Sequence, residues 1–136
     1  MNIKLKNILI ICISVVITFS GNATDISQNE LFKQMSSNDK PFVIDVRTAD
    51  EYIKGHVPGA INIPHLQIKN RMNEILAHKD RDIVLYCRSG RRAGIAKDDL
   101  ISGGFSKLTH LEGDFNAWSA NKMPIEKGHN NNLITP

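Results

Sequence analysis

The chain has 136 residues, of which 17 are basic and 14 acidic, so its formal charge is +3. That length suits one domain, and a hydrophobic content of 41% without a Pro/Gly excess excludes a disordered chain. A charge of +3 is too weak to indicate a nucleic-acid partner.

The first residues are predicted to be a targeting segment rather than part of the fold. Lys4 and Lys6 precede an almost entirely apolar run, Ile8 to Phe19, which is followed by the small-residue segment Gly21-Asn22-Ala23. Because a membrane-spanning helix needs about 20 apolar residues, we favour a cleaved signal peptide over an uncleaved membrane anchor. Residues 1–23 are then removed, and we expect a periplasmic or secreted protein without stable membrane association once processed.

Removal of this segment also decides the cysteine count. Cys12 lies in the apolar run, so Cys87 is the single thiol of the remaining chain. One thiol cannot form an internal disulfide, and in an oxidising compartment it is buried, paired with another chain, or reactive.

The remaining chain alternates helical patterns with short apolar runs. Ser27 and Glu30 have the spacing of a capping box and open a helix that is expected to bury Leu31, Phe32 and Met35. Further on, strands are expected at 42–46, 61–63, 83–86 and 107–111, and helical segments at 68–76, 93–100 and 115–118.

Short strands separated by helices indicate βαβ units. The predicted fold class is α/β, with a central parallel sheet and helices on both faces. We expect one domain over residues 24–127, followed by a loose tail at 128–136.

Cys87 directly follows the apolar run at 83–86 and begins the loop Cys87-Arg88-Ser89-Gly90-Arg91-Arg92, which leads into a predicted helix. Binding sites of parallel sheets lie beyond the carboxyl ends of the strands. A loop that enters a helix points backbone N–H groups into one concavity, and these groups with three arginines favour a thiolate. A buried structural cysteine is the alternative, which the neighbouring arginines disfavour.

Several motifs, in the same order, resemble those of the rhodanese family over nearly the whole chain after residue 23. They are Val43-Ile44-Asp45-Val46-Arg47, Glu51-Tyr52, Gly55-His56-Val57-Pro58-Gly59-Ala60, Asn62-Ile63-Pro64, Tyr86 to Arg92, Gly104-Phe105, Leu111-Glu112-Gly113, Trp118 and Met123-Pro124-Ile125. The resemblance implies a single rhodanese-like domain that transfers sulfur from thiosulfate, or a similar donor, through a cysteine persulfide. Two residues depart from the family pattern: Ala93 replaces a common Ser, and Asp114 replaces a second Gly.

The resemblance also assigns roles to residues. Cys87 is the expected nucleophile, which passes sulfur to an acceptor such as cyanide or a thiol. Substrate binding is expected from Arg88, Ser89, Gly90, Arg91 and Arg92, and the family match favours Arg92 and Arg91 among the arginines.

Other motif residues have a structural interpretation. Asp45, Arg47 and Glu51 are expected to form ion pairs and hydrogen bonds that brace the strand end, and His56 to hold a turn. The other histidines have no metal-ligand spacing, and neither a metal nor an organic cofactor is expected. The sequence does not indicate the oligomeric state.

Two other functions stay open. One is a rhodanese-like binding module without catalytic activity, although such modules often lack the cysteine. The other is a phosphatase, whose phosphate-binding arginine follows the nucleophile by six positions. Arg92 is five positions after Cys87 and Ala93 is six, which favours sulfur transfer.

Overall fold

The protein forms one α/β domain in a computed structural model that describes residues 25–128. Its five strands lie in the order β1-β5-β4-β2-β3, and every pairing between them is parallel. The strands are β1 (Asp25–Ile26), β2 (Phe42–Asp45), β3 (Ile61–Asn62), β4 (Ile83–Tyr86) and β5 (Leu108–Leu111). The predicted signal peptide and nearly all of the predicted tail lie outside the described residues.

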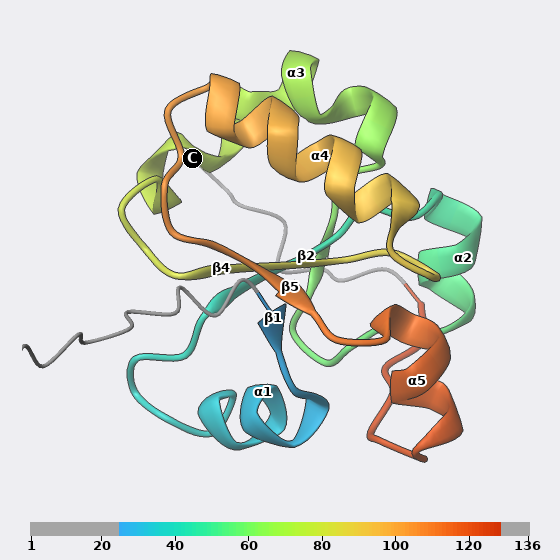
Figure 1. The fold of residues 1–136 in the computed structure, drawn as a ribbon. Coiled ribbons are helices and arrows are strands. Elements are labelled where there is room, and N and C mark those ends of the chain that lie inside the picture. Colours follow the sequence, from blue (N-terminus) through green and yellow to red (C-terminus); the bar gives the residue numbers. More distant parts are fainter. Residues whose placement is uncertain (1–24, 129–136) are drawn as a thin grey trace, which may run out of the picture.

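Helices cover both faces of this sheet (Figure 1). One face carries the 3-10 helix η1 (His65–Gln67), α3 (Ile68–Arg71), the 3-10 helix η2 (Met72–His78) and α4 (Arg91–Ser102). The opposite face carries α1 (Gln28–Gln34), α2 (Ala49–Lys54) and α5 (Asp114–Ala120). The predicted α/β class, with a parallel sheet between two helical layers, is confirmed. None of the helices in residues 25–128 is long and apolar enough to cross a membrane.

Alternation along the central strands divides the core into two clusters. Ile44 and Leu85 face the α3–α4 layer, whereas Val43 and Val84 face the α1–α5 layer together with Trp118. Both faces of the central strands are buried, which explains why β2 and β4 are uninterrupted apolar runs instead of alternating ones.

Helix α1 begins as predicted, at the N-cap Ser27, whose hydroxyl accepts the Glu30 amide at 3.2 Å. Leu31 is fully buried and Met35 is partly buried, but the prediction that Phe32 is buried is wrong, because its side chain is 43% exposed. A helix of seven residues turns one narrow stripe toward the sheet, and Phe32, next to Leu31, lies outside that stripe.

Helix α2 is an element that the sequence analysis did not predict. Its N-cap is Thr48, and Thr48 and Glu51 form a complete capping box. Strand β1 was also missed, because two residues carry no periodic signal and are strand only through their pairing with β5.

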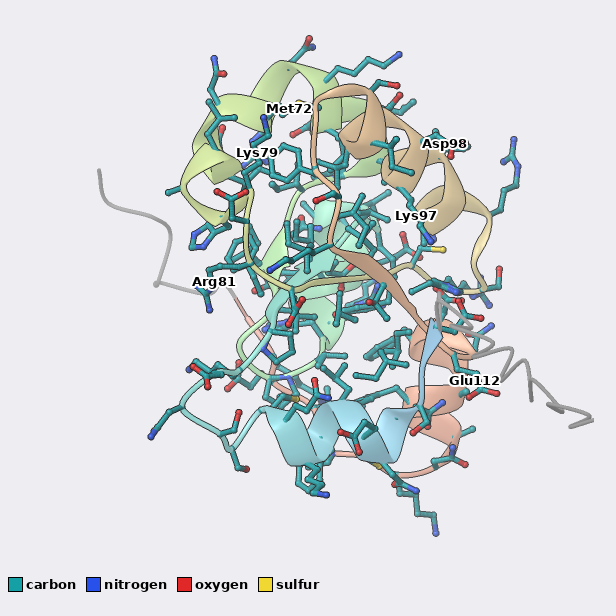
Figure 2. The ribbon with its side chains drawn as sticks, turned by 60° about the vertical axis from the view of Figure 1, so that its left-hand side comes forward. Met72, Lys79, Arg81, Lys97, Asp98 and Glu112 are labelled. Atoms are coloured by element: carbon teal, nitrogen blue, oxygen red, sulfur yellow. The ribbon has the colours of Figure 1, made fainter. Side chains whose placement is uncertain are left out.

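Two consecutive glycines end α4 where side chains of η2 and of its C-cap residue approach closely. A Cβ at Gly103 would collide with Met72, and a Cβ at Gly104 would lie 2.8 Å from Nζ of Lys79. Met72 and Lys79 are labelled in Figure 2. The Gly-Gly pair therefore lets the chain turn closely past η2 on its way to β5.

Candidate active site

Cys87 is the first residue after β4, at the carboxyl edge of the sheet where binding sites of parallel sheets form. The start of α5 holds it in place through the backbone. The Phe115 amide donates to the Cys87 carbonyl at 3.0 Å, and the Asn116 amide donates to the Arg88 carbonyl at 3.1 Å. Because these carbonyls point toward α5, the Arg88 and Ser89 amides, which lie in the same peptide planes, point away from α5.

The Gly90 amide donates a hydrogen bond of 3.0 Å to Sγ of Cys87. Gly90 is the N-cap of α4 and has a φ of +110°, a conformation that L side chains rarely adopt. Among residues 25–128, no acceptor meets the amides of Ser89, Arg91 or Arg92. The amides of Ser89, Arg91 and Arg92 are thus free to bind an anion, and the amide of Gly90 contacts the sulfur.

The thiol is much less accessible than the sequence analysis expected. Cys87 is 1% exposed and belongs to the apolar cluster on the α3–α4 face of the sheet. The prediction that the arginines keep this residue out of an apolar environment is wrong. Arg88 and Arg91 extend into solvent while the cysteine side chain faces the core side of the loop.

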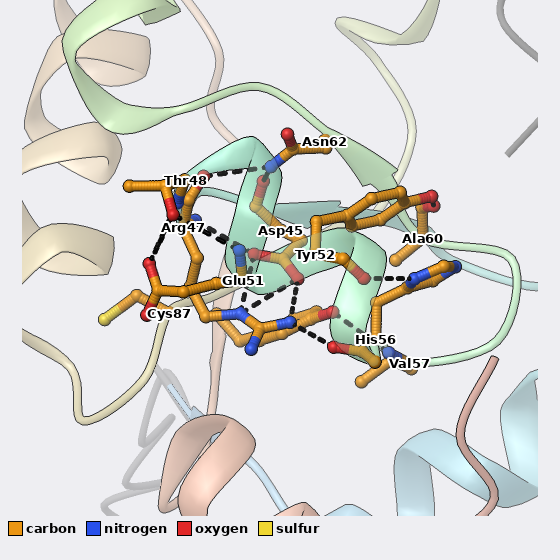
Figure 3. Close-up of polar contacts among 12 residues, drawn as sticks. Asp45, Arg47, Thr48, Glu51, Tyr52, His56, Val57, Ala60, Asn62 and Cys87 are labelled. Atoms are coloured by element: carbon orange, nitrogen blue, oxygen red, sulfur yellow. Dashed lines mark hydrogen bonds and ion pairs between the residues drawn. The ribbon is translucent and has the colours of Figure 1, made fainter. Parts of the chain in front are cut away.

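Arg92 is the least exposed of the three loop arginines, and it pairs with Glu51 of α2. Its two terminal nitrogens donate to the two carboxylate oxygens at 2.7 and 2.9 Å. The hydrogen bond from Arg92 lowers the pKa of Glu51 to about 2, with help from Thr48. The bond to Glu51, with smaller contributions from Cys87, raises the pKa of Arg92. Arg92 thus interacts with both Glu51 and Cys87, which are labelled in Figure 3.

Glu51 therefore does not join Asp45 and Arg47 in one bracing group. Those two form their own buried pair, in which Arg47 donates to Asp45 at 2.6 Å and to the Gly55 carbonyl at 2.7 Å (Figure 3). Burial lowers the pKa of Arg47, but the bond and charge of Asp45 outweigh burial and leave it raised. The pair joins the end of β2 to the end of α2.

Tyr86 and Phe115 enclose the Arg47–Asp45 pair. The Arg47 guanidinium lies 4.0 Å from the centre of the Phe115 ring, and the Tyr86 hydroxyl accepts the Val57 amide at 3.0 Å. Burial, followed by the Asp45 charge, raises the pKa of Tyr86 well above its usual value. The Asp45 carboxylate and the Arg47 guanidinium form a buried pair that is neutral overall, which suits a supporting role rather than acid–base chemistry.

His56 lies on the far side of this pair from the loop. Its Nδ1 lies 2.8 Å from the Tyr52 carbonyl, and its ring stacks on the Tyr52 ring at 3.7 Å. Its backbone exchanges two hydrogen bonds with Glu126. In the described part of the chain, His56 contacts the turn and the C-terminal segment and not the Cys87 loop.

Asp114 is a site residue that the sequence analysis assigned no role. Its Oδ1 accepts the Cys87 amide at 2.8 Å, and both of its carboxylate oxygens lie within 3.0 Å of Nε2 of His110. The departure from a second glycine was visible in the sequence. The sequence did not show that Asp114 binds the Cys87 amide and the His110 ring, because these groups meet only in the folded chain.

A hollow of about 350 Å³ opens beside the loop, between α2 and α5. Phe115 and Ile125 form an apolar part of its wall, and Lys54, Arg88 and Lys127 supply positive charge around it. Glu51, which is paired with Arg92, also lines the hollow, so its wall is partly apolar and mainly basic. Within residues 25–128, no cluster of His, Cys, Asp and Glu could hold a metal ion.

The sequence model of the rhodanese-like domain matches residues 28–121, which are most of the described chain. The chain belongs to the rhodanese family. Among its relatives, a sulfurtransferase of Allochromatium vinosum is 35% identical over 101 residues, which are 74% of this chain and 92% of that protein. The thiosulfate sulfurtransferase PspE of Escherichia coli is 41% identical over 69 residues, which are 51% of this chain and 64% of that protein.

The chain also matches part of longer rhodanese proteins. For example, it covers 52% of the rhodanese-like domain-containing protein 15 of Arabidopsis thaliana. A solved structure of a rhodanese with anions from E. coli is 34% identical to this chain. It covers 65% of this chain and 99% of its own, with a TM-score of 0.55. The relatives support sulfur transfer as the general activity of this rhodanese.

Proposed function

We propose that this rhodanese is a thiosulfate sulfurtransferase in which Cys87 carries the transferred sulfur as a persulfide. The single observation that carries the proposal is the six-residue loop from Cys87 to Arg92, with the Gly90 amide on Sγ and further amides free to bind an anion. The relative of E. coli that is named a thiosulfate sulfurtransferase supports this choice of donor.

In the first step, the Cys87 thiolate attacks the outer sulfur of thiosulfate. The new bond joins Sγ to that sulfur, the S–S bond of thiosulfate breaks, and sulfite leaves with the bonding pair. Thiosulfate and sulfite are both dianions, so the total charge is conserved and the persulfide keeps one negative charge. The loop amides and the nearby arginines stabilise this charge where it develops.

In the second step, a nucleophile takes the outer sulfur. Cyanide attacks it, the sulfur–sulfur bond of the persulfide breaks, and thiocyanate leaves while the Cys87 thiolate is restored. A thiol acceptor would instead carry the sulfur away as its own persulfide. The hollow beside Arg88 is basic and partly apolar, and this lining suits a small thiol acceptor.

Loop length separates this proposal from a phosphatase. The loop between Cys87 and the first turn of α4 is short, and its last arginine is held by Glu51 five residues after the nucleophile. A phosphatase loop places its arginine one position later, and an error of about 1 Å in position costs roughly 100-fold in rate.

The test follows the covalent intermediate directly. Intact mass spectrometry of the purified protein is expected to gain one sulfur atom after thiosulfate and to lose it after cyanide, with thiocyanate released in equal amount. Cys87→Ser is expected to gain none. Release of phosphate from an aryl phosphate by the same preparation, without thiocyanate formation, would overturn the proposal.

We also propose that the protein acts after export, as a periplasmic or secreted enzyme. The support is the charged, apolar and small-residue order of residues 1–23. The donor and acceptor would then be small molecules of that compartment.

A further inference from the structure

Asp114 has a backbone conformation that is unusual for its residue type. Its φ is +54°, in the left-handed region, directly after Gly113 at +71°. Aspartate tolerates this region better than most residues, but the conformation still costs free energy and persists only where surrounding contacts hold it. The side chain is buried, with 2% of the residue exposed.

Two partners occupy the buried carboxylate. The Cys87 amide donates to Oδ1 at 2.8 Å, and Nε2 of His110 lies 3.0 Å from Oδ1 and 2.9 Å from Oδ2. The other ring nitrogen of His110 lies 3.5 Å from the Asp25 carboxylate of β1. A line of polar groups therefore runs from the sheet edge to the backbone of the cysteine.

The same carboxylate supports the other end of the loop. A Cβ on Gly90 would lie 3.2 Å from Oδ2 of Asp114 and 3.7 Å from Cε1 of His110. Gly90 therefore lies close to the side chains of Asp114 and His110, and its amide donates to Sγ of Cys87. Movement of either side chain would disturb the backbone at Cys87 and at Gly90, whose amide contacts the sulfur.

The charge of Asp114 has a consequence for chemistry at the thiol. A buried carboxylate at the amide of a nucleophilic cysteine opposes a thiolate and an anionic persulfide unless a cation balances it. His110 is the group in position to do so. The hydrogen bond that His110 donates to Asp114, followed by the charges of Asp114 and Asp25, raises the pKa of His110 against the effect of burial.

The charged groups around His110 are few. Asp25 faces it from β1 and Asp114 from α5, while its neighbour across the sheet in β4 is the apolar Leu85. From the loop it meets Gly90, and Arg92 of the same loop is paired with Glu51.

We propose that His110 and Asp114 are a positioning pair for the Cys87 loop, in which protonated His110 balances the Asp114 carboxylate and so favours the anionic form of the sulfur. The role in turnover rests on the proposed sulfurtransferase function, but the effect on the thiol does not. Neither side chain is a catalytic residue, because each acts through the backbone and charge of the loop.

The test measures the thiol without any sulfur donor. The ultraviolet absorbance of the thiolate is measured as a function of pH in the full chain. For each protein, the curve of the same protein carrying Cys87→Ser is subtracted. This subtraction removes the contribution of Cys12 and of the tyrosines. The proteins are wild type, His110→Gln, Asp114→Asn, the double variant of both, and Glu112→Gln.

His110→Gln leaves the carboxylate unbalanced and is expected to raise the midpoint of the titration by on the order of one pH unit. Adding Asp114→Asn removes the charge but keeps an oxygen for the Cys87 amide and a residue that tolerates a positive φ. The double variant is therefore expected to return the midpoint to near that of wild type. Glu112→Gln removes an exposed carboxylate two residues earlier, whose side chain points outward in Figure 2, and is expected to change nothing.

The proposal would be overturned if the midpoint is unchanged in His110→Gln. It would also be overturned if the midpoint of the double variant shifts as far as that of His110→Gln, because removing a charge would not rescue a purely structural contact. His110→Asn provides the same comparison if His110→Gln does not fold. If the midpoints move as expected in a protein that transfers no sulfur from thiosulfate, the proposed function fails and the positioning pair stands.

Discussion

The Arg92 guanidinium holds both oxygens of the Glu51 carboxylate, although the two residues are 41 positions apart in the sequence. The pair joins the first turn of α2 to the first turn of α4 beside Cys87. Thr48 also donates to Glu51, from its amide and its hydroxyl, both at 3.0 Å. The conformation of the loop arginine therefore depends on a capping box in another helix.

Glu51→Gln is expected to remove an acid-sensitive part of the stability. The pKa of Glu51 is lowered from 4.5 to about 2, chiefly by Arg92, so its contribution is fully present above pH 4.5 and is lost as pH falls toward 2. Denaturant midpoints measured from neutral to acidic pH should fall less steeply in Glu51→Gln than in wild type. Glu112→Gln serves as the control, and a slope as steep in Glu51→Gln as in this control would contradict the prediction.

Arg92→Ala is expected to reduce thiosulfate:cyanide sulfurtransferase activity by about 100-fold, because the start of α4 loses its tie to Glu51 and the site loses a charge. Arg91→Ala, a change at the exposed neighbour, is expected to cost less than about tenfold. Steady-state kinetics of both variants check the order. Equal losses would show that general loop charge, not the position of Arg92, sets the rate.

Arg47→Met is expected to lower the free energy of unfolding by about 3–5 kcal/mol, because it leaves the Asp45 carboxylate buried without its partner. The matched change Arg71→Met breaks an exposed pair with Glu74 and is expected to cost less than about 1 kcal/mol. Urea unfolding of the two variants compares the pairs directly. Similar losses would mean that burial of the Asp45–Arg47 pair does not set its importance.

Cys87 is expected to react slowly with a bulky maleimide in the folded protein and rapidly after unfolding in denaturant, because the residue is 1% exposed. Peptide mapping by mass spectrometry separates its label from that of Cys12. Rapid, complete labelling of the native protein would contradict the burial. After unfolding, a fraction that is labelled only once a reductant is added would identify thiol held as a mixed disulfide or a reversibly oxidised form, and a label that carries one additional sulfur would identify a persulfide.

The exported protein is expected to begin at Thr24, after cleavage following Gly21-Asn22-Ala23. N-terminal sequencing of material from the cell envelope fraction identifies the first residue. Recovery of an intact segment 1–23 on that material would replace the signal peptide with a membrane anchor.

Local pattern was enough to predict most of the elements. β4 has the expected bounds, and β2, β3, β5, α4 and α5 lie within a few residues of their expected positions. Buried parallel strands are continuous apolar runs, and α4 carries Ala93, Ala96 and Leu100 at helical spacing, so both leave a strong signal in sequence. Helix α2 could have been found from its Thr48–Glu51 spacing, which is a capping box that the analysis did not use.

The candidate site was predicted unevenly. The position of Cys87 at a strand end and the short loop to Arg92 follow from the order of residues, because both features are local. The partner of Arg92 was not predicted, since Glu51 was grouped with Asp45 and Arg47, its neighbours in sequence. Distant pairings of this kind depend on how α2 and α4 pack at the same edge of the sheet.

The sequence alone determined the α/β class, the parallel sheet and the place of Cys87 at the end of a strand, because periodicity, turn residues and loop length are properties of neighbouring residues. Only the tertiary structure decided that Cys87 is buried, that Arg92 meets Glu51, and that Asp114 holds the Cys87 amide against His110. The Arg92–Glu51 and Cys87–Asp114 contacts join residues that lie 41 and 27 positions apart along the chain. Their geometry is set by the packing of helices onto both faces of one sheet, which no local pattern records.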